Sequence, residues 1–152
     1  MPRQTESFDQ HDVDFSMIME KNRLESFFKG NWPFTEDCIC TPQRMAEAGF
    51  YHCPTQKEPD AARCFSCLKE LDGWEPSDDP WKEHRKHTID KGRKCEFIKL
   101  GKVQSELTVE EFLQIMQCRH ASLIQESSKR LTDEFKEASE KLRDEMEKLG
   151  KA

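Results

Sequence analysis

Residues 63–95 read RCFSCLKELDGWEPSDDPWKEHRKHTIDKGRKC, and the spacing of their cysteines and histidines is typical of a metal site. That spacing is Cys-x2-Cys-x16-His-x10-Cys, from Cys64 and Cys67 through His84 to Cys95. Three thiolates and one imidazole form a tetrahedral donor set that Zn²⁺ takes in structural sites. A redox Cys-x-x-Cys pair would instead need a strand–turn–helix setting within a βαβ pattern, which this sequence lacks. We therefore predict one structural zinc ion per chain.

The histidine ligand has two candidates by spacing alone, because His87 follows His84 by only three residues. Pro80 is preceded by two possible caps, Asp78 and Asp79, and an acidic cap before a proline is typical of a helix start. We expect this helix to present the histidine and the loop after it to supply Cys95. Spacing does not choose between the two histidines.

Further motifs accompany the cysteine pair: NWPF at residues 31–34, RMAEAGF at residues 44–50 and GWEPSDDPWKEH at residues 73–84. Together they resemble the BIR repeat of the inhibitor-of-apoptosis proteins, over a stretch from Arg23 to the C-terminus. The resemblance implies that His84 is the ligand. The segment at residues 88–94 departs from the family pattern by an insertion, so its loop is expected to differ in shape.

The expected fold class is α+β, with short helices around a three-stranded antiparallel sheet and one long C-terminal helix. We expect residues 1–22 to be a flexible tail, residues 23–100 the BIR zinc module, and residues 101–152 a linker and the long helix. The first helix carries Leu24, Phe27 and Phe28 on one face, and a second helix spans about residues 42–48. The strands are expected at Phe50, Tyr51 and Cys53, at residues 62–71, and at Trp74.

The long helix has a strong start signal and a long apolar stripe. Thr108 and Glu111 form a predicted capping box at its N-terminus. At 1.5 Å per residue the helix would reach about 60 Å, against a module about 30 Å across, so half of it is expected to project. We predict that a coiled coil or helix bundle covers the projecting stripe. The predicted partner stripe includes Leu131, Phe135 and Leu142. The resemblance implies a dimer surface at Leu107, Val109, Phe112 and Leu113, which could instead bind a partner.

Composition limits the cellular setting. The chain has 152 residues, 36% of them charged, and a net charge of −6. No apolar run approaches the ~20 residues of a membrane span, and no signal peptide is seen, so we expect a soluble chain in nucleus and cytoplasm without membrane contact. Seven cysteines in that setting favour metal ligation over disulfides, with Cys38, Cys40 and Cys53 as structural thiols rather than a second metal site with His52. Because the net charge is acidic and the basic residues are interleaved with Glu and Asp, direct binding of nucleic acid is not expected.

A peptide groove and a phosphorylation site complete the predicted sites. Five acidic residues and Trp74 lie within residues 70–79, without a base among them, which suits a peptide's free amino terminus. The resemblance implies that Asp72 and Asp78 hold the amine, that Trp74 shapes a small side-chain pocket, and that Lys69 and His87 hold a phosphate. Thr41, followed by Pro42, matches a proline-directed kinase site and is also a helix cap.

The resemblance implies a non-catalytic adaptor. Its module would read the N-terminal tail of a core histone phosphorylated on its third residue, a threonine. Its helix would bundle with borealin and inner centromere protein, placing Aurora B kinase at the centromere, the kinetochore and the spindle midzone in mitosis, with an anti-apoptotic role and a homodimer when free. The alternative is a direct caspase inhibitor. An enzyme is not expected, because four ligands leave the zinc no open position and too few cysteines remain for a RING.

Overall fold

The computed structural model of the chain describes residues 15–150 and forms two compact units, Met1–Arg119 and His120–Ala152. The first unit holds the small module and the first turns of the long helix, and the second holds the rest of that helix. The first unit extends beyond the predicted zinc module at residues 23–100, because Ile115 and Arg119, in the first turns of the long helix, are buried in it.

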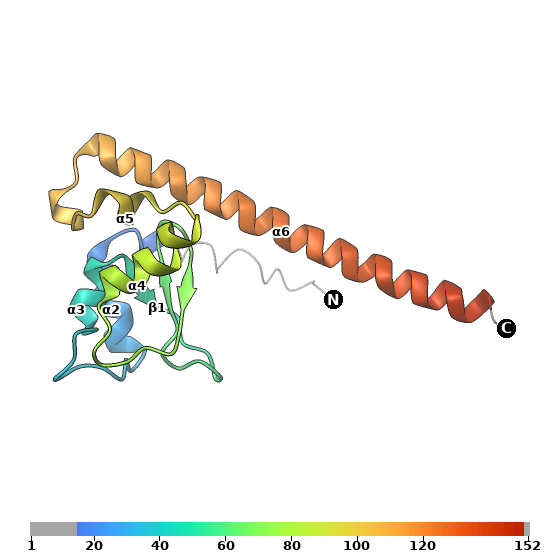
Figure 1. Ribbon diagram of the computed structural model, residues 1–152, viewed down its shortest axis with the longest axis horizontal. Coiled ribbons are helices and arrows are strands. Elements are labelled where there is room, and N and C mark those ends of the chain that lie inside the picture. Colours follow the sequence, from blue (N-terminus) through green and yellow to red (C-terminus); the bar gives the residue numbers. More distant parts are fainter. Residues whose placement is uncertain (1–14, 151–152) are drawn as a thin grey trace, which may run out of the picture. The chain divides into compact units, whose positions relative to one another are not determined.

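The sheet of the first unit has three short antiparallel strands, β1 (Phe50–His52), β2 (Ala62–Cys64) and β3 (Glu70–Leu71), in the order β1-β2-β3 (Figure 1). Its register places Tyr51 opposite Arg63. Helices α2 (Glu20–Lys29) and α3 (Pro42–Glu47) pack against each other and against β1. The fold is thus the α+β class predicted from the sequence. Trp74, expected in a strand, instead follows β3 in a loop.

Helix α2 begins earlier than predicted and buries a different face. Phe27 is 1% exposed, but Phe28 is 66% exposed. The fully buried residue one turn before Phe27 is Arg23, which is charged rather than apolar. Ile18, at 5% exposure, belongs to the core. The predicted flexible tail is therefore corrected for residues 15–22, while residues 1–14 lie outside the described part of the chain.

Arg23 explains why the chain before α2 is held in place. Its guanidinium is fully buried and donates hydrogen bonds to the carbonyls of Met17, Ile18 and Ala46. Its Cζ also lies 4.3 Å above the centre of the Phe65 ring, a cation–π arrangement. Burial lowers the pKa of Arg23 to about 10, which still leaves it charged near neutral pH. A buried cation of this kind needs those carbonyls, so it fixes residues 17 and 18 to the end of α3.

The second half of the first unit is helical. Helix α4 (Pro80–His87) leads through the 3-10 turn η1 (Ile89–Lys91) to α5 (Glu96–Leu100), the 3-10 turn η2 (Gln104–Glu106) and the long helix α6 (Val109–Gly150). The predicted capping box of α6 is confirmed, since Thr108 Oγ1 accepts the Glu111 N–H at 3.2 Å and the Glu111 carboxylate accepts the Thr108 N–H at 2.9 Å. Arg119 donates a hydrogen bond to the Phe65 carbonyl at 2.5 Å. Within residues 15–150, none of the helices is both long and apolar enough to cross a membrane.

Gly49 and Gly73 provide a test of how closely the module is packed. Both have positive φ, 92° and 69°, but a Cβ on Gly49 would lie 2.9 Å from Phe97 Cδ1 whereas one on Gly73 would meet nothing within 4 Å. We expect Gly73→Ala to cost about 1 kcal/mol of unfolding free energy from backbone strain. Gly49→Ala should cost about 1–3 kcal/mol more, because it also overpacks the core. Denaturant unfolding of the zinc-saturated proteins measures both values, and equal losses would mean that the Gly49 site relaxes around the methyl group.

Candidate functional site

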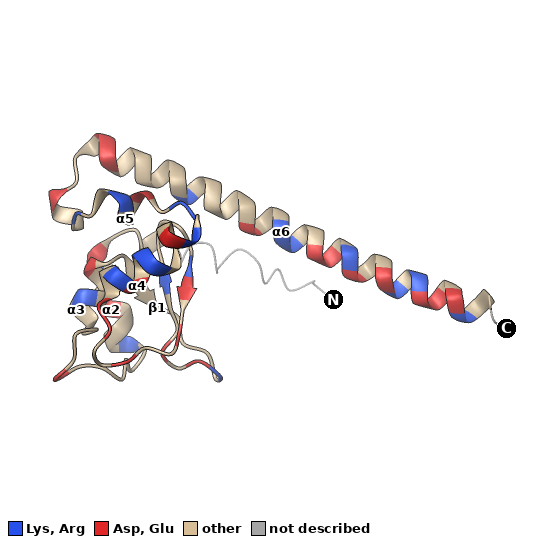
Figure 2. Ribbon diagram, in the orientation of Figure 1, with Lys and Arg blue, Asp and Glu red and all other residues tan. Residues whose placement is uncertain are grey.

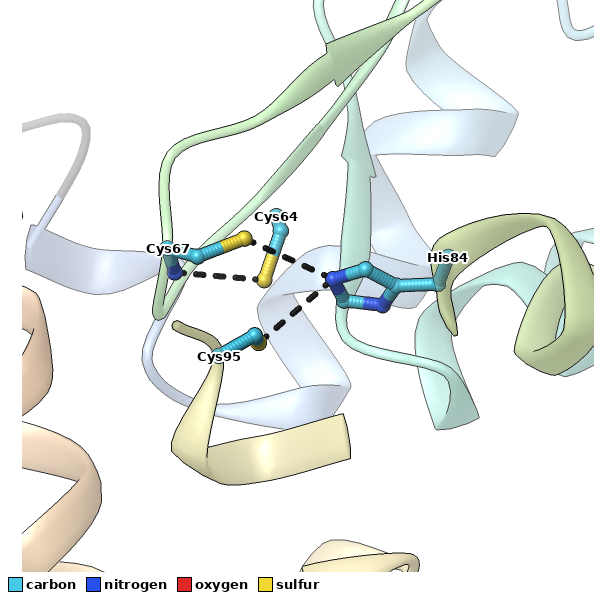
Figure 3. Close-up of side chains that lie close together, drawn as sticks. All are labelled: Cys64, Cys67, His84 and Cys95. Atoms are coloured by element: carbon cyan, nitrogen blue, oxygen red, sulfur yellow. Dashed lines mark hydrogen bonds between the residues drawn. The ribbon is translucent and has the colours of Figure 1, made fainter. Parts of the chain in front are cut away.

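Four buried side chains converge in the first unit: Cys64, Cys67, His84 and Cys95 (Figure 3). One ligand atom from each lies within 4.8 Å of all the others, and none of the four residues is more than 2% exposed. They are the residues predicted from the spacing and the resemblance. The four ligand atoms are therefore close enough together to bind one small cation.

The cysteine pair is positioned by the turn that follows β2. Cys64 is the last residue of β2, and Leu68, with φ of 60°, allows the chain to reverse toward β3. Cys64 Sγ faces the backbone N–H groups of Ser66, at 3.3 Å, and Cys67, at 3.5 Å. Amide N–H groups directed at a sulfur favour its thiolate form. The turn therefore prepares the pair for metal binding.

His84 is oriented by a hydrogen bond outside the cluster. Asp79 caps α4 as predicted, with its carboxylate accepting the Trp81 N–H at 3.0 Å, and α4 presents His84. His84 Nδ1 lies 2.8 Å from the Ala48 carbonyl, and a carbonyl can only accept, so Nδ1 carries the proton. Nε2 then directs its lone pair at the sulfurs of Cys67 and Cys95, 3.5 and 3.6 Å away. This is the tautomer that a metal-binding imidazole requires.

The thiols are electrostatically coupled. Hydrogen bonds from Cys64 and Cys95, with a further contribution from His84, hold the pKa of Cys67 well below its usual range. Burial raises the pKa of Cys64, and the neighbouring sulfurs of Cys67 and Cys95 raise it further, because ionised sulfurs this close together repel one another. A divalent cation removes that repulsion and lets all three sulfurs ionise.

The donor set fits zinc. Three sulfurs and one imidazole match the ligand chemistry of a four-coordinate structural zinc site. When bound, the ion would join the β2 turn, α4 and the start of α5. The protein groups already occupy all four positions of a tetrahedron, so the arrangement suits a structural ion rather than one that binds substrate.

The other histidine and cysteine candidates lie elsewhere. His87 is 29% exposed in its side chain, with Nε2 3.4 Å from the Glu83 carboxylate, and is not part of the cluster. His52 Nε2 lies 2.8 Å from the Pro59 carbonyl. The Cys40 thiol donates to the Glu75 carbonyl, and burial raises its pKa to about 12, so it stays protonated. Among the described residues, a second group of three or more metal ligands is not seen.

The predicted peptide groove needs a correction at Trp74. This side chain is only 6% exposed, and its ring packs edge-on against Phe50 at 5.3 Å and Trp32 at 6.3 Å. Its indole N–H donates to the Leu71 carbonyl. Trp74 is therefore a core residue and not the exposed aromatic wall that the sequence suggested. Its neighbours in the sequence are acidic, and the aromatic residues that surround it in space are far away in the sequence, so the sequence did not indicate its burial.

The remaining groove residues differ in how far the fold already uses them. Asp72 is exposed, and Lys69 is half-buried. Asp78 is half-buried, with one carboxylate oxygen accepting the Glu75 N–H at 2.8 Å. An acidic residue that the sequence analysis did not single out, Asp60, accepts the Trp74 N–H at 2.8 Å and so anchors the same loop.

Thr41 caps α3 as expected, with its Oγ1 accepting the Arg44 N–H at 3.4 Å. Its hydroxyl is half-buried, and Arg44 also lies 3.4 Å from the Asp79 carboxylate. Phosphate at this position would meet the positive end of a helix. Phosphorylation of Thr41 stays a prediction.

Arg23 and Arg119 are structural residues that were not predicted from the sequence. The same sequence feature could have identified both of them. Each stands four positions from a buried apolar residue of its helix, Phe27 and Ile115, where the helical period calls for another apolar side chain. An arginine at such a position indicates a buried guanidinium with carbonyl partners.

Comparisons with known proteins agree with this site. The Inhibitor of Apoptosis domain, BIR, matches residues 23–99. The chain is 50% identical over 129 residues to "Baculoviral IAP repeat-containing protein 5" of Mus musculus, covering 85% of this chain and 89% of that protein. It is 47% identical over 135 residues to the Rattus norvegicus protein of the same name, covering 89% and 91%. It is 48% identical over 129 residues to "Baculoviral IAP repeat-containing protein 5.2-A" of Xenopus laevis, covering 84% and 78%.

Metal analysis of single variants tests the ligand set. We expect one zinc per chain, with Cys64→Ser, Cys95→Ser and His84→Ala each losing most of the zinc and the cooperative unfolding transition, because binding and folding are coupled. His87→Ala is the matched control and should keep both. Loss of zinc in His87→Ala with retention in His84→Ala would overturn the assignment.

Proposed function

Because the chain belongs to the family of proteins that carry the Inhibitor of Apoptosis domain, BIR, we propose that it is a non-catalytic adaptor of the survivin type. The observation that carries this proposal is the extent of the likeness. The domain match ends at residue 99, but the likeness to Baculoviral IAP repeat-containing protein 5, or survivin, covers 85% of the chain. It therefore extends beyond the zinc module toward the long helix.

The metal centre supports a binding role rather than a catalytic one. Its four protein donors are buried and leave no ligand position for water or substrate. A structural zinc ion stabilises the loops around it, and such loops present binding groups on a rigid frame. We propose that this frame presents a groove for a peptide terminus.

In the proposed groove, acidic and basic groups bind different parts of the peptide. Asp72, which is exposed, and Asp78 accept hydrogen bonds from a free N-terminal ammonium. Lys69 and His87 hold a phosphate on the third residue, a threonine. His84 cannot share this task, because both of its nitrogens face the interior. Trp74 supports the loop from beneath and is not proposed as a contact.

The second unit supports a separate role in assembly. Residues 120–150 form a single helix, and one helix by itself cannot bury its own apolar side. Its exposed large apolar side chains, spaced mostly by three, four or seven residues, are Ile124, Leu131, Phe135, Leu142, Met146 and Leu149. Each of them is at least 59% exposed. This is the pattern of a helix that joins a coiled coil or bundle.

The proposed partners of this helix are borealin and inner centromere protein, with Aurora B kinase targeted through the assembly. The proposed place of action is the centromere and kinetochore, then the spindle midzone, in chromosome segregation and cytokinesis. When free, the chain is proposed to pair as a homodimer through Leu107, Val109, Phe112 and Leu113. Val109 and Leu113 are exposed, whereas Leu107 and Phe112 pack partly against the core.

Fluorescence polarisation with four peptides tests the groove. The peptides begin with alanine, carry threonine at position three, and combine a free or acetylated amine with or without phosphate. We expect acetylation to weaken binding at least ~10-fold, which corresponds to the loss of about 1.4 kcal/mol or more from charge-assisted hydrogen bonds. Lys69→Ala and His87→Ala should remove only the part that depends on phosphate, and Lys57→Ala is the control. Equal binding of free and acetylated peptides would contradict the proposed groove.

Pull-down with recombinant borealin and inner centromere protein tests the helix. Leu131→Asp with Leu142→Asp should abolish co-purification, because a carboxylate in an apolar seam costs several kcal/mol. Zinc content should not change. Lys136→Asp with Arg143→Asp, on exposed positions off the stripe, changes more charge and should leave binding intact. If the variant with both leucines replaced still binds, the proposed role of the apolar stripe in assembly is wrong.

A further inference from the structure

Exposed basic residues gather on α4 and on the segment that joins it to α5, and we call them the basic surface. We define it by exposed residues of α4, of the turn after α4 and of the approach to α5: Lys82, Arg85, Lys86, Lys91, Arg93 and Lys94. Residues 82–102 contain eight lysines and arginines against three acidic residues, although the whole chain carries a net charge of −6. Figure 2 shows these basic segments along α4 and before α5.

Most of this charge is not neutralised within the fold. Glu83 pairs with Lys86, Glu96 pairs with Lys99, and Glu111 pairs with Lys102. Lys82, Lys91, Arg93 and Lys94, by contrast, have no carboxylate within 4.0 Å among residues 15–150. The helix dipole explains why basic residues are favourable in the last turn of α4. It does not explain the basic residues at positions 91–94, because they lie beyond the end of the helix.

The turn after α4 is firmly anchored. The Thr88 carbonyl accepts the N–H groups of both Lys91 and Arg93 at 3.0 Å, and Gly92 takes a left-handed conformation with φ of 74°. Thr88 itself is fully buried, and its hydroxyl donates to the His84 carbonyl at 2.6 Å. The backbone that carries these basic side chains is therefore fixed to the helix of the metal centre, so binding through it need not order a loop.

The chemistry of the surface favours a polyphosphate over a protein. Protein interfaces depend on apolar or aromatic anchors. Within residues 80–102 no large apolar side chain is exposed, because Trp81 stacks on Phe97 at 5.5 Å and Ile98 is 1% exposed. Contacts to a phosphate backbone need only positive charge and hydrogen-bond donors.

We infer that the basic surface binds the phosphate backbone of double-stranded DNA, without sequence preference. The expectation of no nucleic-acid binding used the acidic net charge of the whole chain and the interleaving of basic residues with Glu and Asp. Residues 82–102 are nevertheless basic overall, and exposed charges act on a ligand over only about 10 Å at 0.1 M salt. This inference goes beyond the proposed function, and it holds or fails without the histone peptide.

Fluorescence anisotropy with a labelled 20-base-pair duplex and the full chain tests it. We expect a Kd of about 10⁻⁴–10⁻⁶ M, with a logarithmic salt slope of about −3 if three or four phosphates are contacted. Lys82→Glu with Lys91→Glu and Arg93→Glu should weaken binding at least ~10-fold and flatten the slope. These positions leave out Lys94, which adjoins the metal ligand Cys95.

The matched control is Lys129→Glu with Lys136→Glu and Lys148→Glu, which changes the net charge equally on exposed positions of the second unit. The control should bind DNA within about twofold of the unchanged protein, and both variants should retain one zinc. An equal loss in both variants would overturn the inference, since net charge alone would then explain binding. Tighter binding to polyglutamate or to vesicles with anionic lipid than to DNA, compared at equal charge, would also overturn it.

Discussion

The requirement that four buried donors meet around one cation governs the module. The three sulfurs and the imidazole come from the turn after β2, from α4 and from the start of α5, and His84 also bonds to the Ala48 carbonyl beyond α3. Zinc bound by such sites contributes apparent free energies of about 10–16 kcal/mol. This is as large as the whole net stability of an ordinary domain, about 5–15 kcal/mol. The small sheet and short helices therefore depend on the cluster.

The sequence was informative wherever a structural rule acts over a short span. Ligand spacing located the cluster, the Asp79–Pro80 start placed His84 on a helix, and Thr108 with Glu111 located the start of α6. Each of these features involves residues that are neighbours in sequence or that share one ion. Such rules are visible without knowledge of the tertiary fold.

Residues whose environment is set by distant parts of the chain were not predictable in this way. Trp74 lies in an acidic stretch, but its neighbours in space are Trp32 and Phe50. Phe28 matches the apolar period of α2 and is nevertheless exposed, because the buried face of the helix contains Arg23 and Phe27 instead. Periodicity assumes that the buried face is apolar, and a charged side chain satisfied by backbone carbonyls breaks that assumption.

Arg23 also determines where the module can be cut. The BIR match begins at residue 23, yet the guanidinium there depends on the carbonyls of Met17 and Ile18. A recombinant fragment trimmed to the match would bury a cation without two of its acceptors and would also lack the core residue Ile18. The smallest autonomous folding unit thus starts upstream of the BIR match.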